Sequence, residues 1–224
     1  MLERILPRCV HVAERRTDDT GERLYPEELA HISRAVPKRR NEFTTVRHCA
    51  RLALRGLGLP RPPLVPGERG APTWPDDVVG SMTHCAGYRA AVVADREEVR
   101  SLGIDAEPDA PLPSGVAESV TRVAEREHLA ELSAATAGAG TGPHWDRLLF
   151  SAKESVYKTW FPLARRWLGF EDAEVRIRLD GTFVAELLVD GPVVDGRRLA
   201  RLNGRWLAAE QLLLTAIVLP PNPS

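Results

Sequence analysis

The sequence predicts an α+β fold of two similar lobes related by an approximate twofold, with residues 1–103 in the first lobe and residues 104–224 in the second. In each half, stretches with helical periodicity precede two β-rich runs around a turn, at residues 80–94 and 204–219. The two halves share negligible sequence identity, so the prediction of similar lobes rests on the order of the predicted helices and strands in each half. A strand near the middle of the chain lies where the lobes meet, and we expect the functional site there.

Two helices are predicted in the first half. Pro26-Glu27-Glu28-Leu29 begins the shorter one, because proline and acidic residues favour the first helical turn. The longer one covers residues 37–57, with apolar residues at spacings of three and four along one face. On another side of it Arg47, Arg51 and Arg55 recur every four residues. Such a stripe is either a solvated basic face or a site for an anion.

A loop and a hairpin complete the first half. Residues 61–75 are rich in proline and glycine, which predicts a loop, and they include Arg69. The β-rich runs at 78–83 and 88–94 flank Cys85-Ala86-Gly87, which predicts a hairpin. Ser81 and His84 lie toward the turn of this hairpin, although a lone histidine is more often a packed or surface residue than a functional one.

The second half is predicted to contain two helices and an antiparallel sheet. Helical periodicity covers residues 116–132 and 144–168, and Pro162 is expected to kink or end the second helix. The small residues at 134–142 predict a mobile connection. Over residues 174–219, β-rich runs alternate with dipeptides that are typical of hairpin turns: Asp180-Gly181, Asp190-Gly191 and Asn203-Gly204.

The composition excludes several classes of function. The formal net charge is −1, so the chain lacks the basic field with which proteins bind nucleic acid. No apolar run is long enough to cross a membrane, and charged residues interrupt the first sixteen residues, unlike in a signal peptide. The three cysteines are widely spaced, which indicates a reducing compartment and no structural zinc. We therefore expect a cytoplasmic protein.

The predicted strand at the junction, residues 101–108, contains two acids. Asp105 and Glu107 are two residues apart, so their side chains project from one face of the strand. Carboxylates held so close raise each other's pKa unless a cation or a shared proton lies between them. Oxygen donors favour Mg²⁺, Mn²⁺ or Ca²⁺ over zinc. The pair is a candidate metal site, and its ordinary alternative is a strand end with two solvated acids.

Two of the chain's three lysines lie in the second long helix, within the stretch Phe150–Lys158. Glu154 and Lys158 are four residues apart on one side of the helix, and Lys153 precedes Glu154. The ordinary interpretation is a pair that stabilises the helix by a few tenths of a kcal/mol. The functional interpretation is a lysine that binds phosphate, a glutamate that binds metal or acts as a base, and a second lysine for developing charge.

Three motifs in this order closely resemble the signature of the 4′-phosphopantetheinyl transferases. They are Gly80-Ser81-Met82-Thr83-His84-Cys85, with Trp74-Pro75 just before it, then Gly103-Ile104-Asp105-Ala106-Glu107, and then Phe150–Lys158. Their spacing resembles that of the monomeric two-lobed class, in the branch of enterobactin synthase component D. The resemblance covers residues 47–160 and is loose elsewhere. It implies a monomer with its active site between the lobes.

The resemblance also implies roles for single residues. Mg²⁺, with Mn²⁺ as an alternative, is expected on Asp105, Glu107 and Glu154. Lys153 and Lys158 are expected to contact the phosphates or the pantetheine of the substrate, coenzyme A. The 3′-phosphate and pyrophosphate of coenzyme A are expected on Ser81, His84, Arg47, Arg55 and Arg69, and relatives often have lysine at the last of these positions. Glu154 and Lys158 are the implied catalytic residues.

The implied partner is an apo acyl or peptidyl carrier protein, of the kind used in siderophore, polyketide and nonribosomal peptide biosynthesis. Its serine hydroxyl attacks the β-phosphate of coenzyme A, and 3′,5′-ADP leaves. Glu154 is the candidate base, either directly or through a metal-bound water, while the cation and the two lysines stabilise developing charge. The carrier is expected to dock on residues 116–143, so deletion of residues 134–140 should alter its kinetics.

Two other functions are kept as alternatives. Another Mg²⁺-dependent phosphoryl or nucleotidyl transferase would use the same acids and turn over nucleotide without a carrier protein. A non-catalytic anion-binding module would hold nucleic acid or an acidic partner on the arginine stripe, with an affinity that falls steeply as salt is added. The near-neutral net charge and the embedded carboxylates count against the second alternative.

Overall fold

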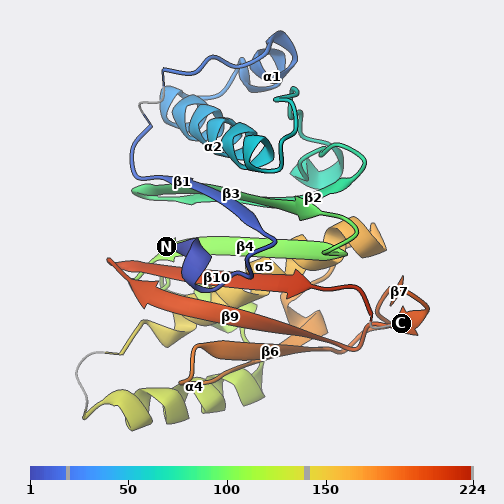
Figure 1. Cartoon of the computed structure of the whole chain (residues 1–224). Coiled ribbons are helices and arrows are strands. Elements are labelled where there is room, and N and C mark those ends of the chain that lie inside the picture. The colour runs from blue at the N-terminus through green and yellow to red at the C-terminus, as the bar shows by residue number, and fades with distance from the viewer. Residues whose placement is uncertain (19–20, 139–141, 223–224) are drawn as a thin grey trace.

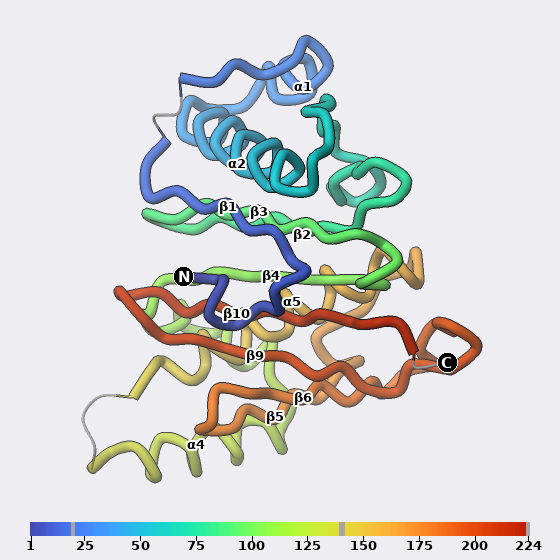
Figure 2. Tube along the Cα trace, in the orientation of Figure 1, coloured from blue at the N-terminus to red at the C-terminus, as the bar shows by residue number. Residues whose placement is uncertain are grey.

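The computed structural model describes residues 1–18, 21–138 and 142–222, and it confirms the α+β class. Two antiparallel sheets lie side by side, each with a long helix on its outer face (Figures 1 and 2). The first sheet has the order β1-β3-β2 and packs on α2, Pro37–Gly56. The second has the order β4-β10-β9-β6-β5 and packs on α5, Trp145–Ala164.

The strands of the first sheet are β1 (His11–Arg15), β2 (Val78–Cys85) and β3 (Tyr88–Asp95). Those of the second are β4 (Ser101–Pro108), β5 (Ala173–Ile177), β6 (Thr182–Leu187), β9 (Arg201–Ala209) and β10 (Leu212–Leu219). A small hairpin joins β7 (Val193–Val194) to β8 (Arg197–Arg198), and the shorter helices are α1 (Pro26–Ile32), α3 (Val116–Val120) and α4 (Val123–Thr136). Single helical turns lie at Leu2–Arg4, Glu68–Gly70 and Phe170–Asp172. Within the described ranges, no helix has the length and apolar character needed to span a bilayer.

Three groups of buried apolar side chains hold the layers together. One lies between α2 and the first sheet and includes Leu54 and Val93. The second fills the space between the two sheets and includes Val92 and Ile104, and the third packs α5 on the second sheet around Trp160. Because β3 is buried on both faces, its neighbouring residues contribute to different groups, as the alternation of side chains along a strand requires.

The strand that contains the two acids, β4, is the edge strand of the second sheet and lies next to β2 of the first. Ile104 and Ala106 point into the core between the sheets, whereas the Ser101 hydroxyl donates to the Thr159 carbonyl oxygen of α5 at 2.8 Å. Asp105 and Glu107 share the face of Ser101, as their spacing predicts. All of β4 pairs with β10, so the expected lobe boundary after residue 103 falls inside one strand, and the division of labour between the lobes remains a prediction.

The predicted turn at Asn203-Gly204 is wrong, because both residues lie within β9. A Cβ atom at Gly204 would lie 2.1 Å from the ring of Phe183, so glycine is needed here for packing rather than for a turn. The turn from β9 to β10 is at Glu210-Gln211, both with positive φ. The turn predicted at Asp180-Gly181 is confirmed, since it joins the paired strands β5 and β6. The turn predicted at Asp190-Gly191 is wrong as a hairpin turn, because it lies between β6 and β7, which do not pair with each other, and the turn that joins β7 to β8 is at Asp195-Gly196.

Three predicted helix and loop boundaries also need correction. Residues 116–132 form two helices instead of one, because the backbone is extended at Thr121 and Arg122. The connection predicted at 134–142 begins within α4, and residues 139–141 lie outside the described part of the chain. The second long helix ends at Ala164, two residues after Pro162, and not near residue 168.

Gly103 allows α5 to approach β4 closely, and it gives a first prediction. A Cβ atom at this position would lie 2.2 Å from the Ser155 carbonyl oxygen and 2.8 Å from the Thr159 backbone nitrogen. Gly103→Ala should therefore lower the free energy of unfolding by about 3 kcal/mol, since the helix must shift to admit the methyl group. Gly138→Ala is the matched control, because among the described residues nothing apart from its chain neighbours lies within 4 Å of the added Cβ. Urea denaturation of the two variants checks this, and equal stabilities would contradict it.

Candidate active site

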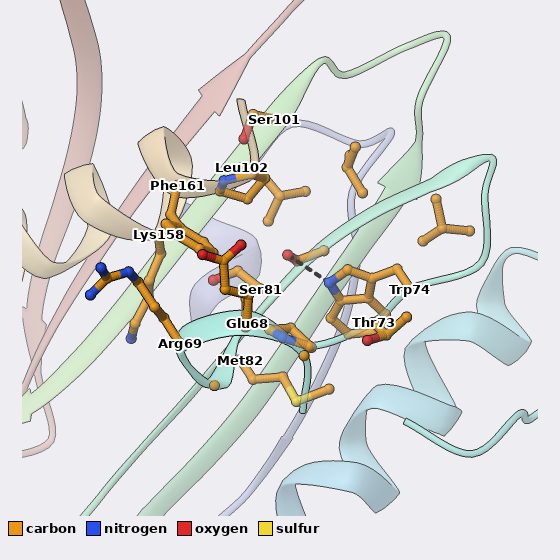
Figure 3. A pocket seen from close by; sticks show the side chains of 18 of the residues that line it. Glu68, Arg69, Thr73, Trp74, Ser81, Met82, Ser101, Leu102, Lys158 and Phe161 are labelled. Atoms are coloured by element: carbon orange, nitrogen blue, oxygen red, sulfur yellow. Dashed lines mark hydrogen bonds between the residues drawn. The ribbon is translucent and has the colours of Figure 1, made fainter. Parts of the chain in front are cut away.

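A cavity of about 550 Å³ lies between the two lobes. Its walls come from α2, the loop at residues 67–74, β2, the start of β4 and α5. In Figure 3, Glu68 and Arg69 project from the loop toward the side where Lys158 and Phe161 of α5 lie. Trp74 covers Gly80 and donates from its indole nitrogen to the Gly80 carbonyl oxygen at 2.9 Å, the bond drawn dashed in Figure 3.

Asp105 is held in place beside this cavity, but one of its oxygens has no partner. Its Oδ1 accepts from Lys158 Nζ at 2.7 Å and from Thr83 Oγ1 at 3.2 Å. Its Oδ2 is buried without a hydrogen-bond partner among the described residues. A buried carboxylate oxygen without a hydrogen-bond partner destabilises the folded protein unless a cation or a hydrogen-bond donor binds to it. The unpartnered oxygen therefore indicates a site for a ligand.

The two other predicted acids lie close enough to interact with Asp105. Burial and the charge of Asp105 raise the pKa of Glu154, and Glu107 raises it further. Burial and Asp105 also raise the pKa of Glu107, although Arg147 opposes this by donating to Glu107 Oε2 at 2.9 Å. Mutual repulsion of this kind is what a divalent cation relieves.

The donor set fits a hard divalent cation. All three acids supply oxygen, and Asp105 Oδ2 is available to bind. Within the described residues, no three His, Cys, Asp or Glu side chains already surround one point as metal ligands do. Coordination by all three acids therefore requires at least one side chain to rotate. The residues present are compatible with Mg²⁺ or Mn²⁺.

A cationic group lines the end of the cavity nearest α2. The Arg47 guanidinium lies 3.6 Å from the centre of the Phe43 ring and donates to the Leu64 carbonyl oxygen at 3.2 Å, and burial lowers the pKa of Arg47 to about 10. His84 Nε2 lies 2.6 Å from Arg39 Nη1. Burial and Arg39 lower the pKa of His84, so its ring tends to be neutral before an anion binds.

Only one arginine of the predicted stripe lines the cavity. Arg47 does so, but Arg51 is fully buried and its Nη1 donates to both carboxylate oxygens of Glu28, at 2.9 and 3.1 Å. Arg55 is exposed near the end of α2 and outside the cavity lining. The three arginines therefore differ in role: Arg47 lines the cavity, Arg51 forms a buried ion pair, and Arg55 lies on the surface.

Lys153 points away from the acids. Its ammonium group is buried, 2.8 Å from Glu125 Oε2, and donates to the Phe170 carbonyl oxygen at 2.6 Å. Glu125 in turn accepts from the backbone N–H groups of Arg122 and Val175. Lys153 borders a second cavity of about 120 Å³, which shares the lining residues Glu154 and Tyr157 with the large one. The structure thus separates the two lysines that the sequence places together.

The remaining predicted residues lie on the walls of the large cavity. Ser81 is nearly buried, and its hydroxyl accepts from the Ile104 N–H at 3.1 Å, while Thr83 accepts from the Ala106 N–H at 3.1 Å. These two hydroxyls join β2 to β4 where no strand ladder does. Arg69 adopts a positive φ, lines the large cavity, and its guanidinium carbon lies 5.6 Å from the centre of the Trp167 ring.

Two residues of the site were missed from the sequence. Arg39 lies in the first turn of α2, eight residues before Arg47, so it continues the four-residue spacing of the arginine stripe, with Phe43 at the position between them. That spacing places it on the side of α2 where its Nη1 lies 2.6 Å from His84 Nε2. Arg147 lies seven residues before Glu154 in α5, which is close to two helical turns. That spacing was a usable signal, since it places both side chains on one side of the helix.

Comparisons with known proteins identify the family of the chain. A family model described as the 4′-phosphopantetheinyl transferase N-terminal domain matches residues 27–94, and one described as the 4′-phosphopantetheinyl transferase superfamily matches residues 101–208. The chain is 59% identical over 201 residues to 4′-phosphopantetheinyl transferase Svp of Streptomyces mobaraensis, covering 89% of this chain and 80% of that one. It is 51% identical over 212 residues to 4′-phosphopantetheinyl transferase PptT of Mycobacterium tuberculosis, covering 92% and 91%. It is also 35% identical over 131 residues to enterobactin synthase component D of Escherichia coli strain K12, covering 58% of each chain.

Proposed function

Because this chain belongs to the 4′-phosphopantetheinyl transferase superfamily, we propose that it moves phosphopantetheine from coenzyme A to a serine of an apo carrier protein in a Mg²⁺-dependent reaction. The observation that carries the proposal is the cavity between the lobes, with Glu154 and Lys158 on one wall and Arg47 and His84 on another. Asp105 lies beside the first of these walls, where it accepts from Lys158. A molecule with a diphosphate and a separate phosphate matches this distribution of charge.

We assign the parts of coenzyme A to the walls as follows. The 3′-phosphate lies at Arg47 and His84, with Arg39 as a further cation. The pyrophosphate lies nearer Arg69 and Lys158. Arg55 receives no contact, because it does not line the cavity.

The pantetheine arm is assigned to the smaller cavity. This cavity opens beside Glu154 and Tyr157, and its other lining residues are mostly apolar. The arm is long, thin and only partly polar, so an apolar channel next to the diphosphate suits it. Lys153 therefore contacts pantetheine rather than phosphate, which is the second of the two roles expected for it.

In the reaction, the serine oxygen bonds to the β-phosphorus as the bond to the 3′,5′-ADP leaving group breaks. Glu154 takes the hydroxyl proton. The Lys158 ammonium, fixed by Asp105 and by the Ile104 carbonyl oxygen, meets charge on the phosphoryl oxygens. Mg²⁺, when held by Asp105, Glu107 and Glu154, supplies further positive charge to the diphosphate.

Action as a monomer remains a prediction. Cys9, Cys49 and Cys85 are free thiols, in keeping with a reducing, cytoplasmic compartment. The similarity to enterobactin synthase component D supports carriers of siderophore, polyketide or nonribosomal peptide systems as partners. Docking of the carrier on residues 116–143 remains a prediction.

Release of 3′,5′-ADP tests the proposed function. The protein is incubated with coenzyme A, Mg²⁺ and an apo carrier, and the nucleotide is separated by chromatography. We expect release with the carrier and none when its modified serine is replaced by alanine. Equal release with both carriers would instead support the alternative of a phosphoryl transferase that needs no carrier.

The assignment of His84 predicts a pH dependence of nucleotide binding. The pKa of His84 in the free protein lies below the ordinary 6.5, and a phosphate dianion at the ring raises it, so binding takes up a proton. Affinity for 3′,5′-ADP should therefore increase as the pH falls from the pKa of His84 in the complex to its lower pKa in the free protein. We expect this increase to be about fivefold larger than in His84→Gln. Calorimetry at several pH values checks this, and the variant corrects for protonation of the phosphate itself. Parallel profiles for the two proteins would contradict the assignment.

A further inference from the structure

Arg147 makes the closest cationic contact with Glu107, and the proposed reaction gives it no role. Its Nη1 donates to Glu107 Oε2 at 2.9 Å. Its Nε donates to the Ala110 carbonyl oxygen at 3.1 Å, and its Nη2 donates to the Pro111 carbonyl oxygen at 2.7 Å. Only 16% of the side chain is exposed, so all three nitrogens of a largely buried guanidinium are engaged on one side of the acid group.

These contacts fix Glu107 through a single oxygen. With Oε2 bound to Arg147, Oε1 remains available to a cation. A forked guanidinium that is itself anchored on two carbonyl oxygens holds a carboxylate in one orientation better than a flexible ammonium does. The three acids with Lys158 and Arg147 have a formal charge of −1, which a divalent cation reverses.

The segment after β4 is attached to α5 by bonds other than those of Arg147. Asp109 Oδ1 lies 2.8 Å from His144 Nδ1 and accepts the His144 N–H at 2.9 Å. Asp146 Oδ2 accepts the Leu112 N–H at 3.0 Å. These bonds attach the segment to the start of α5. The bond from Arg147 to Glu107 is therefore not required for that attachment, and it can orient Glu107.

We propose that Arg147 is a positioning residue that orients Glu107 as a ligand for the divalent cation, an inference that rests on the proposed function. Partners of metal ligands typically change metal affinity or activity by 10- to 100-fold when they are replaced. Arg147→Gln removes the fork but keeps a polar side chain, so it should weaken cation binding by about tenfold or more. Arg147→Lys keeps the positive charge but lacks the forked guanidinium. Its affinity for the cation should lie between that of the unmodified protein and that of Arg147→Gln.

Mn²⁺ binding to the full chain, measured by electron paramagnetic resonance of free Mn²⁺ in the presence of coenzyme A, tests this directly. Circular dichroism checks that each variant is folded. If Arg147→Gln does not fold, Arg147→Lys is the test variant in its place. His144→Ala is the matched control, because it removes a bond of the same segment without touching Glu107, and we expect its Mn²⁺ affinity to be unchanged. In a Glu107→Gln background, Arg147→Gln should have no further effect.

Three results would overturn the role of Arg147 while leaving the proposed function intact. They are unchanged or tighter Mn²⁺ binding by Arg147→Gln, an equal loss in His144→Ala, and a further loss in the Glu107→Gln background. Absence of Mn²⁺ binding by the unmodified protein would overturn the metal site itself, and the role of Arg147 with it.

Discussion

Replacing Asp105 with asparagine is expected to lower the rate of phosphopantetheine transfer by about a thousandfold. Asparagine keeps the shape of the side chain and can still accept from Lys158 and Thr83, so the fold should persist. It removes the negative charge and the unpartnered oxygen that the cation needs. A thousandfold loss corresponds to about 4 kcal/mol of lost transition-state stabilisation.

The initial rate of 3′,5′-ADP release with an apo carrier measures this effect, and thermal unfolding verifies the fold. Asp109→Asn is the matched control, since Asp109 lies directly after the same strand and pairs with His144 outside the cavity. We expect the control to change the rate by less than about threefold, as surface substitutions usually do. A rate for Asp105→Asn similar to that of the control would remove Asp105 from the site.

Glu154→Gln is expected to lower the rate by 100- to 10,000-fold, the range that a general base contributes. Glutamine has nearly the same size but accepts no proton, and it is a weaker ligand for a cation. Affinity for coenzyme A without metal should change by less than about threefold, because Arg47, His84 and Lys158 still face the cavity.

Rates at increasing Mg²⁺ concentration separate the two roles of Glu154. If the side chain only holds the cation, excess Mg²⁺ restores the rate, and this result would contradict its role as the base. Glu118→Gln on the exposed side of α3 serves as the control, with no expected change. A Glu154→Gln protein with the unmodified rate would contradict both roles.

Local spacing was sufficient to predict the central part of the site. Asp105 and Glu107 share a face because strand side chains alternate, and Glu154 and Lys158 share a side because they are four apart on a helix. The hairpin of β2 and β3 followed from its flanking β-rich runs and the glycine between them. In each case a pattern within a few residues determined the outcome.

Long-range pairing decided the positions that spacing did not predict. Lys153 turns to Glu125 and Arg51 to Glu28, and both partners belong to other helices. A buried charge needs a partner, and the partner's place depends on the packed fold rather than on the local sequence. The same limit explains Gly204, whose packing against Phe183 of the neighbouring strand outweighs the turn tendency of Asn-Gly.

The central claim is that this chain attaches phosphopantetheine to a carrier protein at a metal-dependent site between its lobes. Intact-mass spectrometry of an apo carrier incubated with the protein, coenzyme A and Mg²⁺ tests it most directly. We predict a gain of one phosphopantetheine on the carrier, lost when EDTA removes the metal and restored by excess Mg²⁺. An unchanged carrier mass across siderophore, polyketide and nonribosomal peptide carriers, or a gain that persists in EDTA, would contradict the account.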